Sequence, residues 1–349
     1  MLLKKRNIIA VFGLLCLLLG MGGLTQKVHA EGAEFSVNPV YTDGQTDKRL
    51  GYLSIKADDA KTYPLTVEVQ NLNTKQSNTF DAQLVAASTT DNGTIDYTPG
   101  KQVMVKSKAP LLPDLVAKAD RKQSFTIDAG ATKKVTFQVK IPKKGFKGTI
   151  LGSIYVKRTS SQQSEKKGFG VTNSFAMTVP TVLSQDFGQK ITPKLSITMA
   201  KLESGSGGVP QVVARIANHD PVMFGQIKMN AWITKQGQTK KLYKKNAEKL
   251  AMAPRSTFKY AIDTNNKLLP KGKYTYHVKM VSGKKTFNLK RNFTVDGAAR
   301  EQVNKTLVNP EKPGINWWLW GSLGILLVLV IALIAYLIGR KRGVGEHDA

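Results

Sequence analysis

The chain has 349 residues, with 52 Lys and Arg against 24 Asp and Glu, and a single cysteine. This length predicts two or three domains, and the apolar fraction of 41% is too high for a disordered chain. One cysteine excludes a disulfide framework and a zinc-finger array, and the net charge of +28 indicates an anionic partner: nucleic acid, a membrane surface or an acidic polymer.

Residues 1–30 have the pattern of a secretory signal peptide. Three basic residues, the apolar run 8–19 and a small-residue site ending at Ala30 follow one another. We expect cleavage after Ala30, which also removes Cys16. Because the remaining chain would lie outside the cell, an intracellular nucleic-acid partner is excluded.

The region after this leader alternates apolar and polar residues in short runs bounded by Gly, Pro, Asn and Asp, which is typical of β-strands. No sustained helical period interrupts the runs, so antiparallel sheets are favoured. We therefore predict an all-β ectodomain made of two immunoglobulin-like β-sandwiches. The clearest runs are 65–69, 135–141, 227–233, 274–278 and 287–295.

A polar, turn-rich segment at 184–194 predicts the boundary between the two sandwiches, residues 31–184 and 185–300. Charge changes across it. The first part holds 21 basic and 14 acidic residues, a net of +7, and the second holds 22 and 6, a net of +16. Segments 88–100 and 157–170 are predicted loops of the first sandwich, the latter mobile.

The C-terminal region predicts a membrane anchor. Residues 301–316 are polar with two prolines and indicate a stalk, and residues 317–338 carry no charge and at about 1.5 Å per residue match the roughly 30 Å hydrocarbon core. Residues 339–349 would be a cytoplasmic tail. The anchoring residues are interfacial aromatics and a basic stop-transfer cluster: Trp317, Trp318, Trp320 and Tyr336, then Arg340, Lys341 and Arg342.

An ordered series of segments over residues 34–296 resembles a known family. In the first half it comprises EFSVNP (34–39), GYLSI (51–55), LTVEVQNL (65–72), NGTIDY (92–97), TKKVTF (132–137) and IPKKGFKGTILGSI (141–154). The second half adds ANHDP (217–221), LAMAPRS (250–256), LPKGKY (269–274) and GKKTF (283–287). The order is similar to that of the WxL-interacting proteins of Gram-positive bacteria.

This resemblance implies a membrane-anchored surface adaptor. The first domain would bind peptidoglycan, and the second would bind a WxL-type surface protein or a host matrix protein. The chain is not itself a WxL protein, since it lacks paired Trp-x-Leu motifs in a soluble domain. It also lacks a sortase signal before the span, so we expect it to remain in the membrane.

The sequence gives little support for catalysis or for a cofactor. His219 and His277 are the histidines of the ectodomain, and each is explained as an ordinary turn or strand residue. The neighbours Asp58 and Asp59 are explained as turn caps, and segment 91–96 lacks the full calcium-loop series. We therefore expect no enzyme activity, no metal and no cofactor.

Basic clusters in the second domain are the strongest binding candidates. As contacts for an anionic wall polymer we single out Lys240, Lys241, Lys244, Lys245, Lys284 and Lys285. An equally simple interpretation is a solubilising face that protects sheet edges. Clustered charge nevertheless steers and retains an anionic partner, although each contact alone is weak.

Two functions from different classes remain open. The first is an adaptor that bridges peptidoglycan to a WxL-type or host protein. The second is a membrane-held assembly factor or chaperone for WxL-type proteins, without wall or host binding. A glycan hydrolase is the weakest alternative, because no carboxylate pair can be placed in a cleft.

Overall fold

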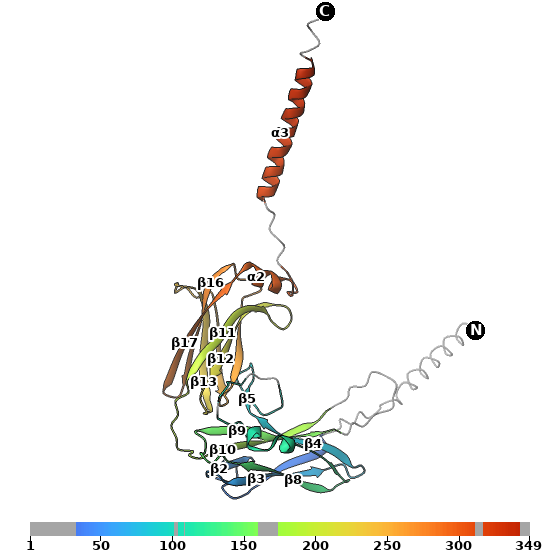
Figure 1. Cartoon of the computed structure of the whole chain (residues 1–349), viewed down its shortest axis with the longest axis vertical. Helices are drawn as coiled ribbons and strands as arrows, with labels where there is room; N and C mark the ends of the chain where they lie inside the picture. Colours follow the sequence, from blue (N-terminus) through green and yellow to red (C-terminus); the bar gives the residue numbers. More distant parts are fainter. Residues whose placement is uncertain (1–32, 101–103, 108, 160–173, 311–316, 343–349) are drawn as a thin grey trace, which may run out of the picture.

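The computed structural model describes residues 33–100, 104–107, 109–159, 174–310 and 317–342 (Figure 1). The predicted leader with its cleavage after Ala30, most of the loop expected at 157–170 and the end of the tail lie outside these residues. Strands dominate the described residues up to 310, and a long apolar helix follows them. The expected all-β fold with a C-terminal apolar helix is therefore confirmed.

The first sandwich consists of a three-stranded and a five-stranded sheet that face each other across one core. The alternation in the sequence produces this arrangement, since in β3 every second residue from Tyr63 to Asn71 is buried. β2 pairs in parallel with β10, whereas the remaining pairs in these two sheets are antiparallel. The first sheet, in spatial order, contains β1 (Phe35–Val40), β3 (Thr62–Asn71) and β8 (Thr132–Lys140). The second contains β2 (Leu53–Lys56), β10 (Ala176–Ser184), β9 (Thr149–Arg158), β4 (Asn78–Ala86) and β7 (Lys122–Ile127).

The connection between β4 and β7 is long and carries its own structure. It contains the short pair β5 (Ser88–Thr89) and β6 (Ile95–Asp96), and the 3-10 helices η2 (Leu112–Leu115) and η3 (Lys118–Arg121). The predicted loop at 88–100 thus includes a small hairpin, with Gly93 at φ +73° in its turn.

The second sandwich again places two sheets around one core. Both its sheets are antiparallel throughout. The three-stranded sheet contains β11 (Leu195–Ser204), β12 (Pro210–Asn218) and β15 (Thr257–Asp263). The four-stranded sheet contains β14 (Tyr243–Met252), β13 (Phe224–Lys235), β16 (Gly272–Ser282) and β17 (Lys285–Val295). The immunoglobulin-like character of both sandwiches stays a prediction.

A short helix closes the second sandwich at the end away from the first. Helix α2 (Gly297–Asn304) begins at Asp296, whose side chain accepts a 2.7 Å hydrogen bond from the amide of Ala299. Val303 and Leu307 are buried in the second core. Residues 301–307, expected as part of a stalk, therefore pack on the sandwich, because two apolar side chains one helical turn apart face its core.

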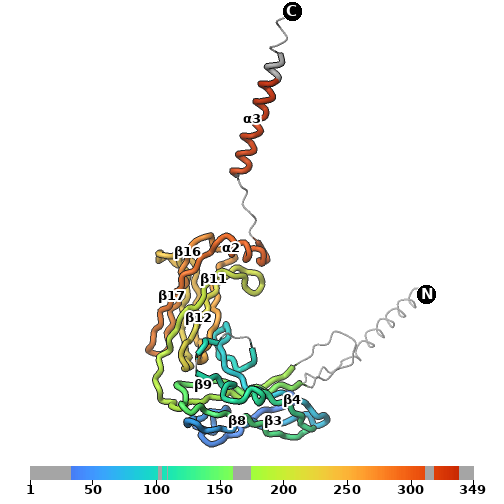
Figure 2. Tube along the Cα trace, viewed as in Figure 1, coloured from blue at the N-terminus to red at the C-terminus, as the bar shows by residue number. Residues whose placement is uncertain are grey.

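The two sandwiches meet in a seam, which we define as Ala87–Tyr97, Ala109 and Pro110 of the first against residues 251–256 of the second (Figure 2). Thr89 Oγ1 accepts from the amide of Ala253 at 3.0 Å. Arg255, only 3% exposed, donates to the carbonyl oxygens of Ala109 and Pro110. Figure 2 shows the second sandwich standing across the first, which gives the pair a bent shape.

Helix α3 (Trp317–Arg342) follows as a separate element (Figure 1). Its segment Trp318–Leu337 is long and apolar enough to cross a membrane, and none of it is buried against the protein. The helix includes all seven expected anchor residues, and their interfacial and stop-transfer roles stay predictions.

Candidate functional site

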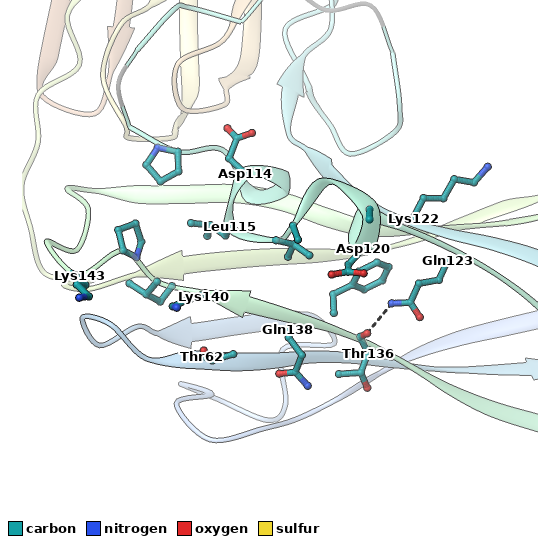
Figure 3. A pocket seen from close by; sticks show the side chains of 17 residues that line it. Thr62, Asp114, Leu115, Asp120, Lys122, Gln123, Thr136, Gln138, Lys140 and Lys143 are labelled. Atoms are coloured by element: carbon teal, nitrogen blue, oxygen red, sulfur yellow. Dashed lines mark hydrogen bonds between the residues drawn. The ribbon is translucent and has the colours of Figure 1, made fainter.

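The first sandwich has an open groove of about 930 Å³ along one side, which we call the β8 groove (Figure 3). One wall is the edge strand β8 and the residues just after it. The opposite wall is built by η2, η3 and the start of β7. Among the side chains labelled in Figure 3, Gln138, Lys140 and Lys143 belong to the first wall, and Asp114, Asp120 and Gln123 belong to the opposite wall.

Strand β8 offers unpaired backbone groups to this groove. It pairs with β3 on one side only, and Gln123 Nε2 donates a 2.8 Å hydrogen bond to the carbonyl oxygen of Thr136 on the other. Backbone groups alternate in direction along an antiparallel strand, so the amide and carbonyl of Gln138 point into the groove as well. Pro64 supports this assignment, because it faces Gln138 in the register and has no N–H to donate.

Charged groups lie at both ends of the groove. Asp114 is paired with Arg121 at 3.3 Å, and Lys122 with Asp81 at 2.8 Å. The hydrogen bonds from Lys122 and Ser124 lower the pKa of Asp81, so this carboxylate is held ionised. Within the described chain, three further exposed groups that line the groove have no ion-pair partner: Lys140, Lys143 and Asp120.

A glycine fixes the wall formed by η2. Leu112 and Leu115 of η2 are buried in the first core. Leu112 lies directly over Gly152 in β9, where an added Cβ would stand 2.5 Å from its Cδ2 atom and 2.3 Å from the carbonyl oxygen of Val85. Only glycine leaves room for this approach.

The six lysines singled out from the sequence do not form one cluster. Lys240 and Lys241 lie in the turn between β13 and β14, at the end of the sandwich that carries α2. Lys284 lies in the turn between β16 and β17 and Lys285 begins β17, at the opposite end, where Lys285 Nζ donates to Thr192 Oγ1 at 2.8 Å. Their role as polymer contacts stays a prediction.

The remaining two lysines face different ways. The side chain of Lys245 points toward the three-stranded sheet of the second sandwich. Its Nζ donates to the carbonyl oxygen of Ala261 at 3.0 Å and lies 4.8 Å from the centre of the Tyr260 ring. Lys244 pairs in register with Trp232 and lies on the outer face of the four-stranded sheet. Neighbours in sequence therefore point to opposite sides of the strand.

The outer face of the four-stranded sheet carries a ladder of aromatic and basic side chains. Trp232 stacks on His277 with ring centres 5.1 Å apart and planes 2° apart, and Lys241 Nζ lies 4.7 Å from the centre of the Trp232 ring. His277 is half-buried and shares a 3.1 Å hydrogen bond with Thr234, so it is more enclosed than the ordinary strand residue expected from the sequence. Lys290 is its register partner on β17.

The enclosure of His277 predicts a pH dependence of stability. Burial, followed by the charges of Lys290 and Lys241, lowers the pKa of His277 below its ordinary value. A lowered pKa means that the unfolded chain takes up the proton more readily, so this stability is present above the unfolded value of 6.5 and is lost as the pH falls below it. We expect the urea midpoint of unfolding to decrease when the pH is lowered from about 7.5 to about 5. The decrease should be smaller in His277→Gln. An identical slope in the variant would contradict the assignment.

The other polar residues considered from the sequence have local partners. His219 Nε2 lies 2.7 Å from Ser196 Oγ, and Asp58 Oδ2 accepts from the Tyr63 hydroxyl at 3.0 Å. Asp91 Oδ1 accepts from the amide of Lys259 at 2.8 Å and thereby joins the two sandwiches. In the described residues no group of three or more His, Cys, Asp or Glu could hold a metal ion.

Comparison with known families gives two matches in chain order. A model described as the WxL Interacting Protein peptidoglycan binding domain matches residues 35–158, and one described as the WxL Interacting Protein host binding domain matches residues 166–305. The second match includes β10, although β10 is hydrogen-bonded to β9 and β2 in the first sandwich. No curated protein matches the chain.

Three solved structures show distant likenesses to this chain. The class 5 fimbriae chaperone CfaA is 14% identical over 74% of this chain and 98% of its own, with a TM-score of 0.26. The E. coli chaperone DraB is 15% identical over 75% and 97%, with a TM-score of 0.27. The calcium binding domain CBD12 of CALX1.1 is 11% identical over 64% and 76%, with a TM-score of 0.20. Such TM-scores bear on neither the fold nor the function.

Proposed function

The chain belongs to the WxL Interacting Protein family, and from this premise we propose that it is a non-catalytic surface adaptor held by helix α3 with its C-terminus in the cytoplasm. The first sandwich binds peptidoglycan in the β8 groove. The second binds a WxL-type surface protein or a host matrix protein. The observation that carries the proposal is the ordered pair of family matches, one for a wall-binding and one for a host-binding domain.

The chemistry of the β8 groove suits peptidoglycan. That polymer presents amide groups on its N-acetylated sugars and on its peptides, together with free carboxylates. The free edge of β8 supplies an N–H and a C=O at Gln138, which can pair with such amides as a further strand would. Lys140 and Lys143 lie beside this edge and can receive carboxylates.

The β8 groove, the aromatic and basic ladder and helix α3 lie on different parts of the protein, as an adaptor requires. The groove lies on the first sandwich, whereas α2 and the apolar helix follow the second. The aromatic and basic ladder lies on the second sandwich, so wall and partner contacts would not compete for one surface. Helix α3 would retain the protein at the membrane.

Replacing Gln138 with proline tests the groove. Proline removes the N–H at the free edge but leaves the pairing with β3 intact, because the opposing Pro64 donates nothing there. We expect peptidoglycan affinity of the detergent-solubilised chain to fall about three- to tenfold, the equivalent of one hydrogen bond. Sedimentation with purified peptidoglycan measures this.

Lys134→Pro is the matched control. Lys134 lies on the same edge of β8, opposite Glu68, and outside the groove. Lys134→Pro should leave peptidoglycan affinity unchanged. Equal losses of affinity in the two variants would show that peptidoglycan does not bind in the β8 groove. If the unaltered chain does not bind peptidoglycan at any salt concentration but binds a co-produced surface protein tightly, the assembly-factor function is favoured instead.

A further inference from the structure

We propose that the outer face of the four-stranded sheet of the second sandwich, centred on Trp232 and His277, binds a linear sulfated polysaccharide. We call this surface the ladder face. The inference rests on the proposed function of the second sandwich as the partner-binding domain and names the chemistry of one partner.

The first argument is charge. Strands β13, β14, β16 and β17 carry ten basic residues and one acidic residue. The acidic residue, Glu248, is already paired with Lys228 at 3.9 Å. On the ladder face, Lys241, Lys244, Lys279 and Lys290 are exposed and form no ion pair within the described chain. A field of one sign over a continuous face attracts a polyanion.

The second argument is regular spacing. One row crosses all four strands, because Lys244 pairs with Trp232, Trp232 with His277, and His277 with Lys290. Three interstrand spacings of about 4.8 Å place the two terminal lysines about 14 Å apart. The sheet fixes these positions, so a stiff polymer of sugar rings would lose less conformational freedom on it than a flexible polyol phosphate chain would.

The third argument concerns the groups between the lysines. The neighbouring row contains Asn246, Asn230, Lys279 and Asn288, and the row on the other side ends in Thr275 and Asn292, which bond each other at 2.8 Å. Amide and hydroxyl side chains suit the hydroxyl groups of sugars. A face for a lipid surface would instead carry exposed apolar side chains.

The electrostatic state of His277 agrees with this picture. Burial lowers the pKa of its imidazole most, and Lys290 and Lys241 lower it further because their charges make the local potential more positive. A bound polyanion would cancel that potential. The pKa of His277 therefore reports occupation of the ladder face.

The experiment uses the full chain in nanodiscs of zwitterionic lipid, with heparin as the probe. We expect the triple variant Lys241→Gln, Lys244→Gln, Lys290→Gln to bind heparin at least about tenfold more weakly. The corresponding Lys→Arg triple should bind within about twofold of the parent, since charge is retained. The matched control is Lys190→Gln, Lys194→Gln, Lys267→Gln, which removes the same charge from exposed positions outside the four-stranded sheet and should also stay within about twofold.

Further measurements test whether heparin binds at the ladder face and which class of polyanion binds there. Heparin should raise the pKa of His277 in an NMR titration, and desulfated heparin should not. Equal losses in the two Gln triples, or an unchanged His277, would overturn the proposal, as would tighter binding of polyglycerol phosphate or of anionic vesicles. Peptidoglycan sedimentation should be unaffected by the ladder triple, so a failure here is distinct from a failure of the β8 groove.

Discussion

Arg255→Ala is expected to lower the free energy of unfolding of the full chain by about 2 kcal/mol and to loosen the seam. The side chain is 3% exposed and supplies hydrogen bonds to the carbonyl oxygens of Ala109 and Pro110. Hydrogen bonds from a charged donor are worth about 1.5–3 kcal/mol each. Burial lowers the pKa of Arg255, however, so alanine also relieves the cost of an enclosed charge, and the net loss is smaller than the sum of the two hydrogen bonds.

The backbone conformation of Arg255 allows a second substitution to be compared with Arg255→Ala. Its φ of +50° is strained for any residue with a Cβ, so Arg255→Gly should be about 1 kcal/mol less destabilising than Arg255→Ala. Arg49→Ala is the control, because that arginine is 90% exposed and should leave the urea midpoint almost unchanged. A midpoint for Arg255→Ala equal to that of the parent would show that the seam does not depend on this side chain.

Gly152→Ala should destabilise the first sandwich by about 2–3 kcal/mol and weaken peptidoglycan binding with it. The new methyl group would stand 2.3 Å from the carbonyl oxygen of Val85 and 2.5 Å from Leu112. The backbone of β4 cannot retreat, so Leu112 must move and take η2 with it, and η2 forms one wall of the β8 groove. Urea unfolding and sedimentation with peptidoglycan measure the two effects.

Gly225→Ala is the matched control for that substitution. Gly225 also lies in a strand, and the nearest atom to its added Cβ is 3.7 Å away, an ordinary contact. We expect its unfolding midpoint and its peptidoglycan binding to match those of the parent. If Gly152→Ala also leaves the unfolding midpoint and peptidoglycan binding unchanged, the position of η2 does not determine the shape of the β8 groove.

Much of the architecture could be predicted because single strands carry their own signal. β3 and β8 alternate cleanly, and the uncharged run at the C-terminus is long enough to specify a helix by itself. Helix α2 was not predicted, because eight residues with little apolar character are too few to establish a helical period from sequence. Its position depends on the contact of Val303 and Leu307 with a core built by distant strands.

The candidate sites depended on pairing, which sequence does not specify. Lys240 and Lys284 look equivalent in sequence, yet register places their turns at opposite ends of one sheet. The ladder face combines four strands, and Trp232 and His277 are 45 positions apart. Pro64 was the one available signal for the β8 groove, because a proline in an alternating strand predicts a place where an N–H is not required.

The packing of α2 and Leu307 on the second sandwich limits how far the protein can reach. Between Pro310 and Trp317 the backbone can span at most about 25 Å. If α3 lies in the bilayer, the second sandwich stays at the lipid surface beneath a cross-linked mesh. Permeation through the mesh would then influence which partners bind: slender unbranched chains and proteins exported by the same cell reach the second sandwich more readily than bulky folded molecules from outside.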